Sequence, residues 1–154
     1  MTIYNVEIDD EGKTILVPKS EIAYTEELCS NGEKIADMLN EVFRADRQAE
    51  EHVWLIAMNI RCDVLGIFEV AHGGADYAHI SNREIFIRLL LIGATSFILA
   101  HNHPSKSDTA SACDIAMTER VERAAQLMNL HFLDHLIVFK GGFVSLREEG
   151  ILEN

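Results

Sequence analysis

Apolar residues along this chain form two kinds of pattern, which are short runs bounded by turn residues and longer stretches with helical spacing. Short apolar or alternating runs suit buried or half-buried strands. The expected strands are a hairpin over residues 2–17 and single strands over residues 53–60, 64–71, 75–80, 95–100, 130–139 and 143–146. The helical spacing predicts helices over residues 31–46, from Ser81 to about Gly93, and over residues 112–129.

Residues that favour helix starts precede each of the three predicted helices. Ser30 and Ser81 are each followed three residues later by a glutamate, which is the spacing of a capping box. Ser111 is also a good N-cap, and Asp114 falls in the first turn, where a negative charge stabilises the helix. The caps therefore support the helices that the apolar spacing predicts.

The order of the elements indicates a mixed sheet. Antiparallel hairpins combine with two helices that cross over between strands, which predicts an α/β or α+β domain with a mixed sheet flanked by helices. With 154 residues, 48% of them hydrophobic, the chain suits one such domain. We expect residues 29–154 to form this domain and residues 1–28 to form a hairpin extension, whose role the sequence leaves open.

The charge balance narrows the class of partner. The formal net charge is -12, with 13 lysines and arginines in total. Proteins bind the phosphate backbone of nucleic acids through lysine and arginine. The composition therefore disfavours nonspecific nucleic-acid binding, and we expect a protein or peptide as the partner.

The cysteines and the apolar runs indicate the compartment. Cys29, Cys62 and Cys113 are odd in number and widely spaced, and no C-x-x-C occurs. The sequence thus predicts neither a disulfide framework nor a thiolate zinc site, and a reducing, cytoplasmic setting is expected. The chain opens with no signal peptide, and no apolar run approaches the ~18 residues of a membrane span, so no contact with a membrane is expected.

The candidate chemistry lies where the predicted strand 95–100 ends. Alternate residues of an extended chain share a face, so His101 and His103 point the same way and Asn102 points away. Ser111 and Asp114 open the next helix, and if that helix starts beside the strand end, two imidazoles and one carboxylate converge. Three protein ligands with a fourth position open are typical of a catalytic zinc site.

Other interpretations of these histidines exist. An isolated H-x-H is more often part of a polar loop than a pair of metal ligands. The letters HNH also suggest HNH nucleases, but the chain lacks their basic character. A nucleobase deaminase would need H-x-E and P-C-x-x-C motifs, and the sequence contains neither.

Several blocks of the sequence together resemble the RadC branch of the JAMM (JAB/MPN) metalloproteases. The spacing His101-x-His103, seven residues, Ser111, two residues, Asp114 resembles the JAMM metal signature. The blocks that resemble RadC proteins are, in order, REIF, HNHPS, DIAMTERV, LDHLIV and VSLREEG. The resemblance covers roughly residues 50 to 150.

The resemblance implies a JAB/MPN fold, related in shape to cytidine deaminases, and zinc-dependent hydrolysis of a peptide or isopeptide bond. His101, His103 and Asp114 would bind one zinc ion per chain, and Ser111 would stabilise the oxyanion. The general base of the family would correspond to Glu51, in the segment Glu51-His52-Val53-Trp54, with Glu50 as the alternative. A second function to weigh is a metal-binding interaction module that catalyses nothing. The plain alternative for Glu51 is a surface residue in a charged run.

The sequence departs from the usual RadC pattern at several loop positions, none of which is a predicted ligand. These positions are Asn82, Lys106, Ala110, Ala112 and Cys113. The chain also shows no helix-hairpin-helix region, which RadC proteins usually carry.

The remaining polar residues have simpler interpretations. Asp134 and His135 either support a metal ligand or form a hydrogen-bonded pair packed beneath the site. Cys113 is expected to face away from the ligands, because it is the immediate neighbour of Asp114 on a helix. Four histidines are expected to be surface or structural residues, namely His52, His72, His79 and His131.

Overall fold

The computed structural model describes residues 1–24, 31–73, 80–105 and 107–152. Within these residues the chain forms a seven-stranded sheet with strand order β2-β1-β4-β3-β5-β6-β7. The strands are β1 (Thr2–Ile8), β2 (Thr14–Glu21), β3 (Glu51–Met58), β4 (Val64–Gly73), β5 (Ser96–Asn102), β6 (His131–Phe139) and β7 (Gly142–Ser145). The helices are α1 (Gly32–Phe43), the short 3-10 helix η1 (Ala45–Arg47), α2 (Asn82–Ile92) and α3 (Ala112–Leu127).

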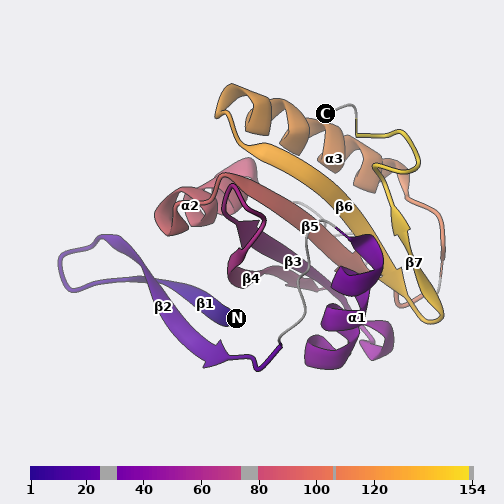
Figure 1. Ribbon diagram of the computed structural model, residues 1–154, viewed down its shortest axis with the longest axis horizontal. Coiled ribbons are helices and arrows are strands. Elements are labelled where there is room, and N and C mark those ends of the chain that lie inside the picture. Colours follow the sequence, from indigo (N-terminus) through magenta and orange to yellow (C-terminus); the bar gives the residue numbers. More distant parts are fainter. Residues whose placement is uncertain (25–30, 74–79, 106, 153–154) are drawn as a thin grey trace.

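The sheet is mixed, as the sequence predicts. β3 pairs antiparallel with both β4 and β5, whereas β5 and β6 are parallel and are joined through α3. α2 and α3 cover one face of the sheet and α1 covers the other (Figure 1). The mixed α/β fold is therefore confirmed.

Two hydrophobic cores lie on the two faces of β3. Its six residues from Val53 to Met58 are buried, because alternate side chains point to opposite faces and each face is covered by helices. Val53 and Leu55 belong to the core beneath α2 and α3, whereas Trp54 and Ile56 belong to the core beneath α1. This burial on both sides explains why the strand is almost continuously apolar.

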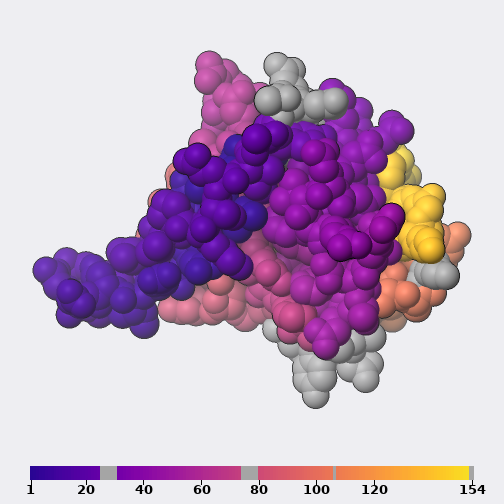
Figure 2. Space-filling model, turned by 90° about the horizontal axis from the view of Figure 1, so that it is seen from below, coloured from indigo at the N-terminus to yellow at the C-terminus, as the bar shows by residue number. Residues whose placement is uncertain are grey.

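The β1–β2 hairpin extends the sheet and projects from the body of the molecule, as the indigo arm in Figure 2 shows. β1 reaches the sheet through a parallel pairing of Ile3 with Ile67 on β4. Gly66 allows this approach, because a Cβ atom added there would lie 2.7 Å from Tyr4 Cδ2 and 2.7 Å from Ile92 Cδ1. The hairpin predicted over residues 2–17 is present, and its second strand continues to Glu21.

Several predicted boundaries differ from the structure. The helix predicted over residues 31–46 ends at Phe43, because Arg44 adopts the left-handed conformation with φ 54° and the chain continues as η1. Ser30, the predicted cap, lies outside the described residues, and Asn31 caps α1 by accepting a hydrogen bond from Lys34 N–H. Ser81 caps α2 as predicted, while the Glu84 carboxylate pairs with Arg88.

The strand predicted over residues 75–80 falls almost wholly outside the described residues. Ile80, its last residue, is buried and lies just before the N-cap of α2 rather than in a strand. β4 instead continues to Gly73, two residues beyond its predicted end. None of the described helices has the length and hydrophobicity needed to cross a membrane.

Replacing Gly66 with alanine should lower the free energy of unfolding by about 1–3 kcal/mol, because the added methyl group overpacks the contact with Tyr4 and Ile92. Urea denaturation followed by circular dichroism would measure the change. The cost should shrink in a Tyr4→Leu background, where the ring no longer crowds the new methyl group. An equal cost in both backgrounds would show that Tyr4 is not the source of the strain.

Candidate metal centre

The end of β5 directs two imidazoles to one face of the sheet. His101 is the penultimate residue of β5, and His103 follows the strand while its backbone N–H still donates to Val138 O on β6 at 2.9 Å. This bond keeps His103 in line with the strand, so the two histidines share a face as predicted, with ring centroids 4.9 Å apart. Both side chains are almost completely buried.

Asn102, between the two histidines, points away from them as predicted. Its side-chain amide donates to Glu50 O at 2.9 Å, and its side-chain oxygen accepts from His52 N–H at 2.7 Å. The alternation along β5 therefore separates two tasks. The histidines face the candidate metal centre, and Asn102 fixes the backbone on either side of Glu51.

The first turn of α3 supplies the carboxylate. Ser111 Oγ accepts from Asp114 N–H at 3.1 Å, and the Asp114 carboxylate accepts from Ser111 N–H at 2.8 Å, which completes a capping box. The same short motif that starts the helix thus orients the Asp114 side chain. The prediction that Ser111 caps this helix is confirmed.

The three predicted ligands meet at distances suited to a metal ion. His101 Nε2 and His103 Nε2 are 3.1 Å apart, and they lie 3.3 Å and 3.5 Å from Asp114 Oδ1 and Oδ2 respectively. Atoms bound about 2.0–2.2 Å from a tetrahedral zinc ion lie roughly 3.3–3.6 Å from one another. The residues therefore fit such an ion, and two imidazoles with one carboxylate also suit other first-row divalent metals.

The electrostatics of the triad favour a negative Asp114. Burial alone would raise the pKa of Asp114, but the interactions of its carboxylate with His101, His103 and Ser111 outweigh the effect of burial and hold that pKa well below its usual range. The hydrogen bond to Asp114 raises the pKa of His103 in turn. A bound cation would replace the proton on the imidazole nitrogen that faces Asp114, because a nitrogen that binds a metal must be deprotonated.

Glu51, the predicted base, lies on the face of the sheet that carries the triad. Val53 is the antiparallel partner of His101, and Glu51 comes two residues before Val53, so Glu51 faces the same side next to His103. After the hydrogen bond to Asp114, the charge of Glu51 also contributes to the raised pKa of His103. The carboxylate of Glu50 instead contacts His72 Nε2 at 2.5 Å.

Asp134 and His135, for which the sequence leaves two interpretations, play different parts near the triad, and His135 contacts His101. His135 on β6 is completely buried, and its Nε2 lies 2.9 Å from His101 Nδ1. The Asp134 carboxylate makes separate bonds, accepting from Ser145 Oγ at 2.6 Å and from Arg147 N–H at 3.2 Å. His135 therefore contacts a predicted ligand directly, whereas Asp134 ties β6 to β7 and the turn after it.

Thr118 completes the support, and the sequence reasoning did not identify it. Its hydroxyl donates to Asp114 O at 2.7 Å and lies 2.6 Å from His135 Nδ1. The available signal was its position four residues after Asp114, which places both on one face of α3. Cys113 is exposed and is not part of the triad.

A second group of histidines and carboxylates lies on β3 and β4. The strand register places His52 opposite His72, and their rings stack 4.0 Å apart. His52 Nδ1 is 2.6 Å from Glu69 Oε1, and His72 pairs with Glu50. These separations are those of short hydrogen bonds between an imidazole nitrogen and a carboxylate oxygen. We interpret the group as two partly exposed pairs, each an imidazole hydrogen-bonded to a carboxylate.

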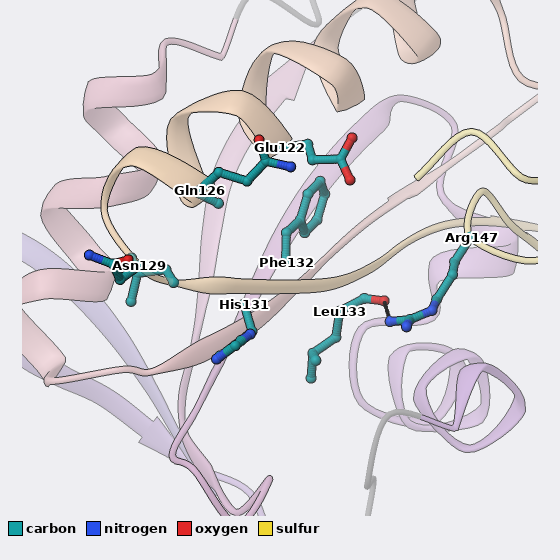
Figure 3. Close-up of a pocket in the computed structure, with 9 residues that line it drawn as sticks. Glu122, Gln126, Asn129, His131, Phe132, Leu133 and Arg147 are labelled. Carbon is teal, nitrogen blue, oxygen red and sulfur yellow. Dashed lines mark hydrogen bonds between the residues drawn. The ribbon is translucent and has the colours of Figure 1, made fainter. Parts of the chain in front are cut away.

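The pocket drawn in Figure 3 lies at the start of β6, at the end of this strand away from the triad. The end of α3, the first residues of β6 and Arg147 line it, with a cavity volume of about 580 Å³. The side chains that line it include Glu122, Phe132 and Arg147. Arg147 Nη1 donates a hydrogen bond to Leu133 O at 2.8 Å. Because β5 and β6 are parallel and the triad follows the end of β5, the pocket and the triad are separated by about 20 Å of strand.

Comparison with known proteins gives a consistent family. The profile of the RadC-like JAB domain matches residues 29–151. A UPF0758 protein of Clostridium kluyveri is 37% identical over 103 residues, covering 67% of this chain and 45% of that protein. A UPF0758 protein of Carboxydothermus hydrogenoformans is 34% identical over 107 residues, covering 70% of this chain and 47% of that protein. The matched part is thus less than half of either relative's length.

Replacing Asp114 with asparagine should lower zinc affinity by at least about 100-fold, because the anionic ligand is lost while the amide oxygen can still cap α3. Competition with a chromogenic chelator would measure affinity, and far-UV circular dichroism would check the fold. Glu69→Gln is the matched control, and we expect it to bind zinc as the wild type does. Unchanged affinity in Asp114→Asn, or equal losses in both variants, would contradict the assigned triad.

Proposed function

Because the chain belongs to the RadC-like JAB domain family, we propose that it is a zinc-dependent hydrolase that cleaves a peptide or isopeptide bond with an activated water. The observation that carries the proposal is the convergence of two imidazoles and one carboxylate at distances of 3.1 to 3.5 Å. When bound, a zinc ion would lower the pKa of water and polarise the scissile carbonyl. The remaining steps belong to residues of the chain.

Glu51 is the general base in this proposal. It lies on the triad face of β3, where the side chain of Asn102 holds the backbone of Glu50 and His52 on either side of it. The Glu51 carboxylate accepts a proton from the attacking water and returns it to the leaving amine. Glu50 is less suited to this role, since its carboxylate is paired with His72.

Ser111 is the oxyanion donor in this proposal. Its Oγ already accepts a hydrogen bond from Asp114 N–H, which leaves the hydroxyl hydrogen to be donated to the oxygen of the tetrahedral intermediate. Ser111 is exposed, whereas His101 and Asp114 are buried. The substrate carbonyl would therefore approach the triad from the side of Ser111.

The charge of the chain supports a protein or peptide substrate. A formal net charge of -12 opposes the approach of a nucleic-acid backbone, whereas a neutral or basic peptide meets no such barrier.

The test is cleavage of a library of peptides and isopeptides by zinc-loaded protein. Glu51→Gln should lower kcat by about 10²- to 10⁴-fold without lowering zinc affinity, because it removes the proton acceptor and no metal ligand. Glu50→Gln is the matched control, and its kcat should stay near that of the wild type. Equal background cleavage by the wild type and Glu51→Gln would favour a metal-binding interaction module instead.

A further inference from the structure

Two polar side chains behind the triad connect two of its members through one buried chain of hydrogen bonds. The chain runs from Asp114 O to Thr118 Oγ1 at 2.7 Å, on to His135 Nδ1 at 2.6 Å, and from His135 Nε2 to His101 Nδ1 at 2.9 Å. Thr118 and His135 are completely buried. In such surroundings each donor needs an acceptor, because an unpaired polar group costs about 1–3 kcal/mol.

The positions of the hydrogens follow from the ends of this chain. Asp114 O is a carbonyl and can only accept, so the single hydroxyl hydrogen of Thr118 points to it. Were that hydrogen directed at His135 instead, two oxygen atoms would face each other at 2.7 Å with no hydrogen between them. Thr118 Oγ1 is therefore an acceptor for His135 Nδ1–H.

The next bond in the chain is determined by the charge state of His135. The His135 ring is completely buried, and its two nitrogens face a hydroxyl and another imidazole, neither of which carries a negative charge that would stabilise a charged ring in the interior, so the ring is neutral. A neutral imidazole has one N–H, and Nδ1 carries it here, so Nε2 is an acceptor. His101 Nδ1 must then donate to it, which leaves the lone pair of His101 Nε2 directed at His103 and Asp114.

We propose that Thr118 and His135 are positioning residues that hold His101 in the Nδ1–H tautomer, the form in which Nε2 can bind a metal. The inference rests on the proposed metal site and assigns to it two residues outside the triad. It also links two ligands, because the chain begins on the backbone of Asp114 and ends on the ring of His101. Groups that orient a ligating histidine in this way typically change metal affinity by about 10- to 100-fold when they are replaced.

The test replaces the Thr118 hydroxyl while keeping the shape of the side chain. Thr118→Val removes the acceptor for His135, Thr118→Ser restores a hydroxyl, and Thr95→Val is the matched control, because Thr95 Oγ1 is buried with no hydrogen-bond partner. Zinc affinity would be measured by chelator competition. The tautomer of His101 would be determined in metal-free protein from imidazole ¹⁵N chemical shifts, which a purely structural role would not alter.

We expect Thr118→Val to bind zinc about 10- to 100-fold more weakly and to shift His101 toward the Nε2–H tautomer. Thr118→Ser and Thr95→Val should both remain within about threefold of the wild type. Wild-type affinity and tautomer in folded Thr118→Val would overturn the inference. Equal weakening in Thr118→Val and Thr118→Ser would also overturn it, since packing would then be the cause.

The tautomer measurement separates this inference from the proposed function. Were the wild type to bind no zinc, the proposed metal site would fail. A shift of His101 to Nε2–H in metal-free Thr118→Val would still support the hydrogen-bond chain. An unchanged His101 tautomer would overturn the chain even if zinc binding were found.

Discussion

The interaction on which this structure depends is a buried carboxylate held between two imidazoles. Asp114 is 4% exposed, and a charge removed from water is stable only when it is paired and hydrogen-bonded. His101 and His103 provide the pairing from the end of β5, and the backbone of Ser111 adds a further hydrogen bond. Because these partners come from a strand and from the helix that follows it, the pairing sets where α3 begins relative to the sheet.

The crossover through α3 turns this local pairing into a supported site. α3 returns the chain so that β6 lies parallel to β5, which places His135 beside His101. Thr118, one turn after Asp114, then reaches His135 from the helix. The connection that completes the sheet therefore also brings together the groups behind the triad, and each of them has a hydrogen-bond partner.

The two groups of histidines and carboxylates differ in how many imidazoles share a carboxylate. On β3 and β4 each imidazole has its own carboxylate, from Glu69 on β4 and from Glu50 just before β3, and the separations of 2.5 to 2.6 Å are those of short hydrogen bonds. At the end of β5 two imidazoles share Asp114, and the separations of 3.1 to 3.5 Å suit an ion at the centre. The ratio of imidazoles to carboxylates, together with burial, thus distinguishes the two hydrogen-bonded pairs from the candidate metal centre.

Local patterns in the sequence determined the parts of the molecule that depend on neighbours along the chain. Strand alternation was sufficient to put His101 and His103 on one face, and the Ser111–Asp114 spacing was sufficient to predict the cap of α3. The same local pattern predicted a helix that is longer than α1, because the spacing of apolar residues does not reveal the left-handed turn at Arg44. Glu51 came from resemblance to a family, since nothing in its own segment distinguishes it from Glu50.

Only the tertiary structure decided which distant segments meet. The contact between His101 and His135 depends on the parallel register of β5 and β6, and the pairing of His52 with His72 depends on the antiparallel register of β3 and β4. Apolar periodicity predicts that a segment is a strand, but it carries no information on which strand lies beside it. Strand order and register follow from packing the whole chain around two cores, so Thr118 and His135 acquire their roles only in the folded protein.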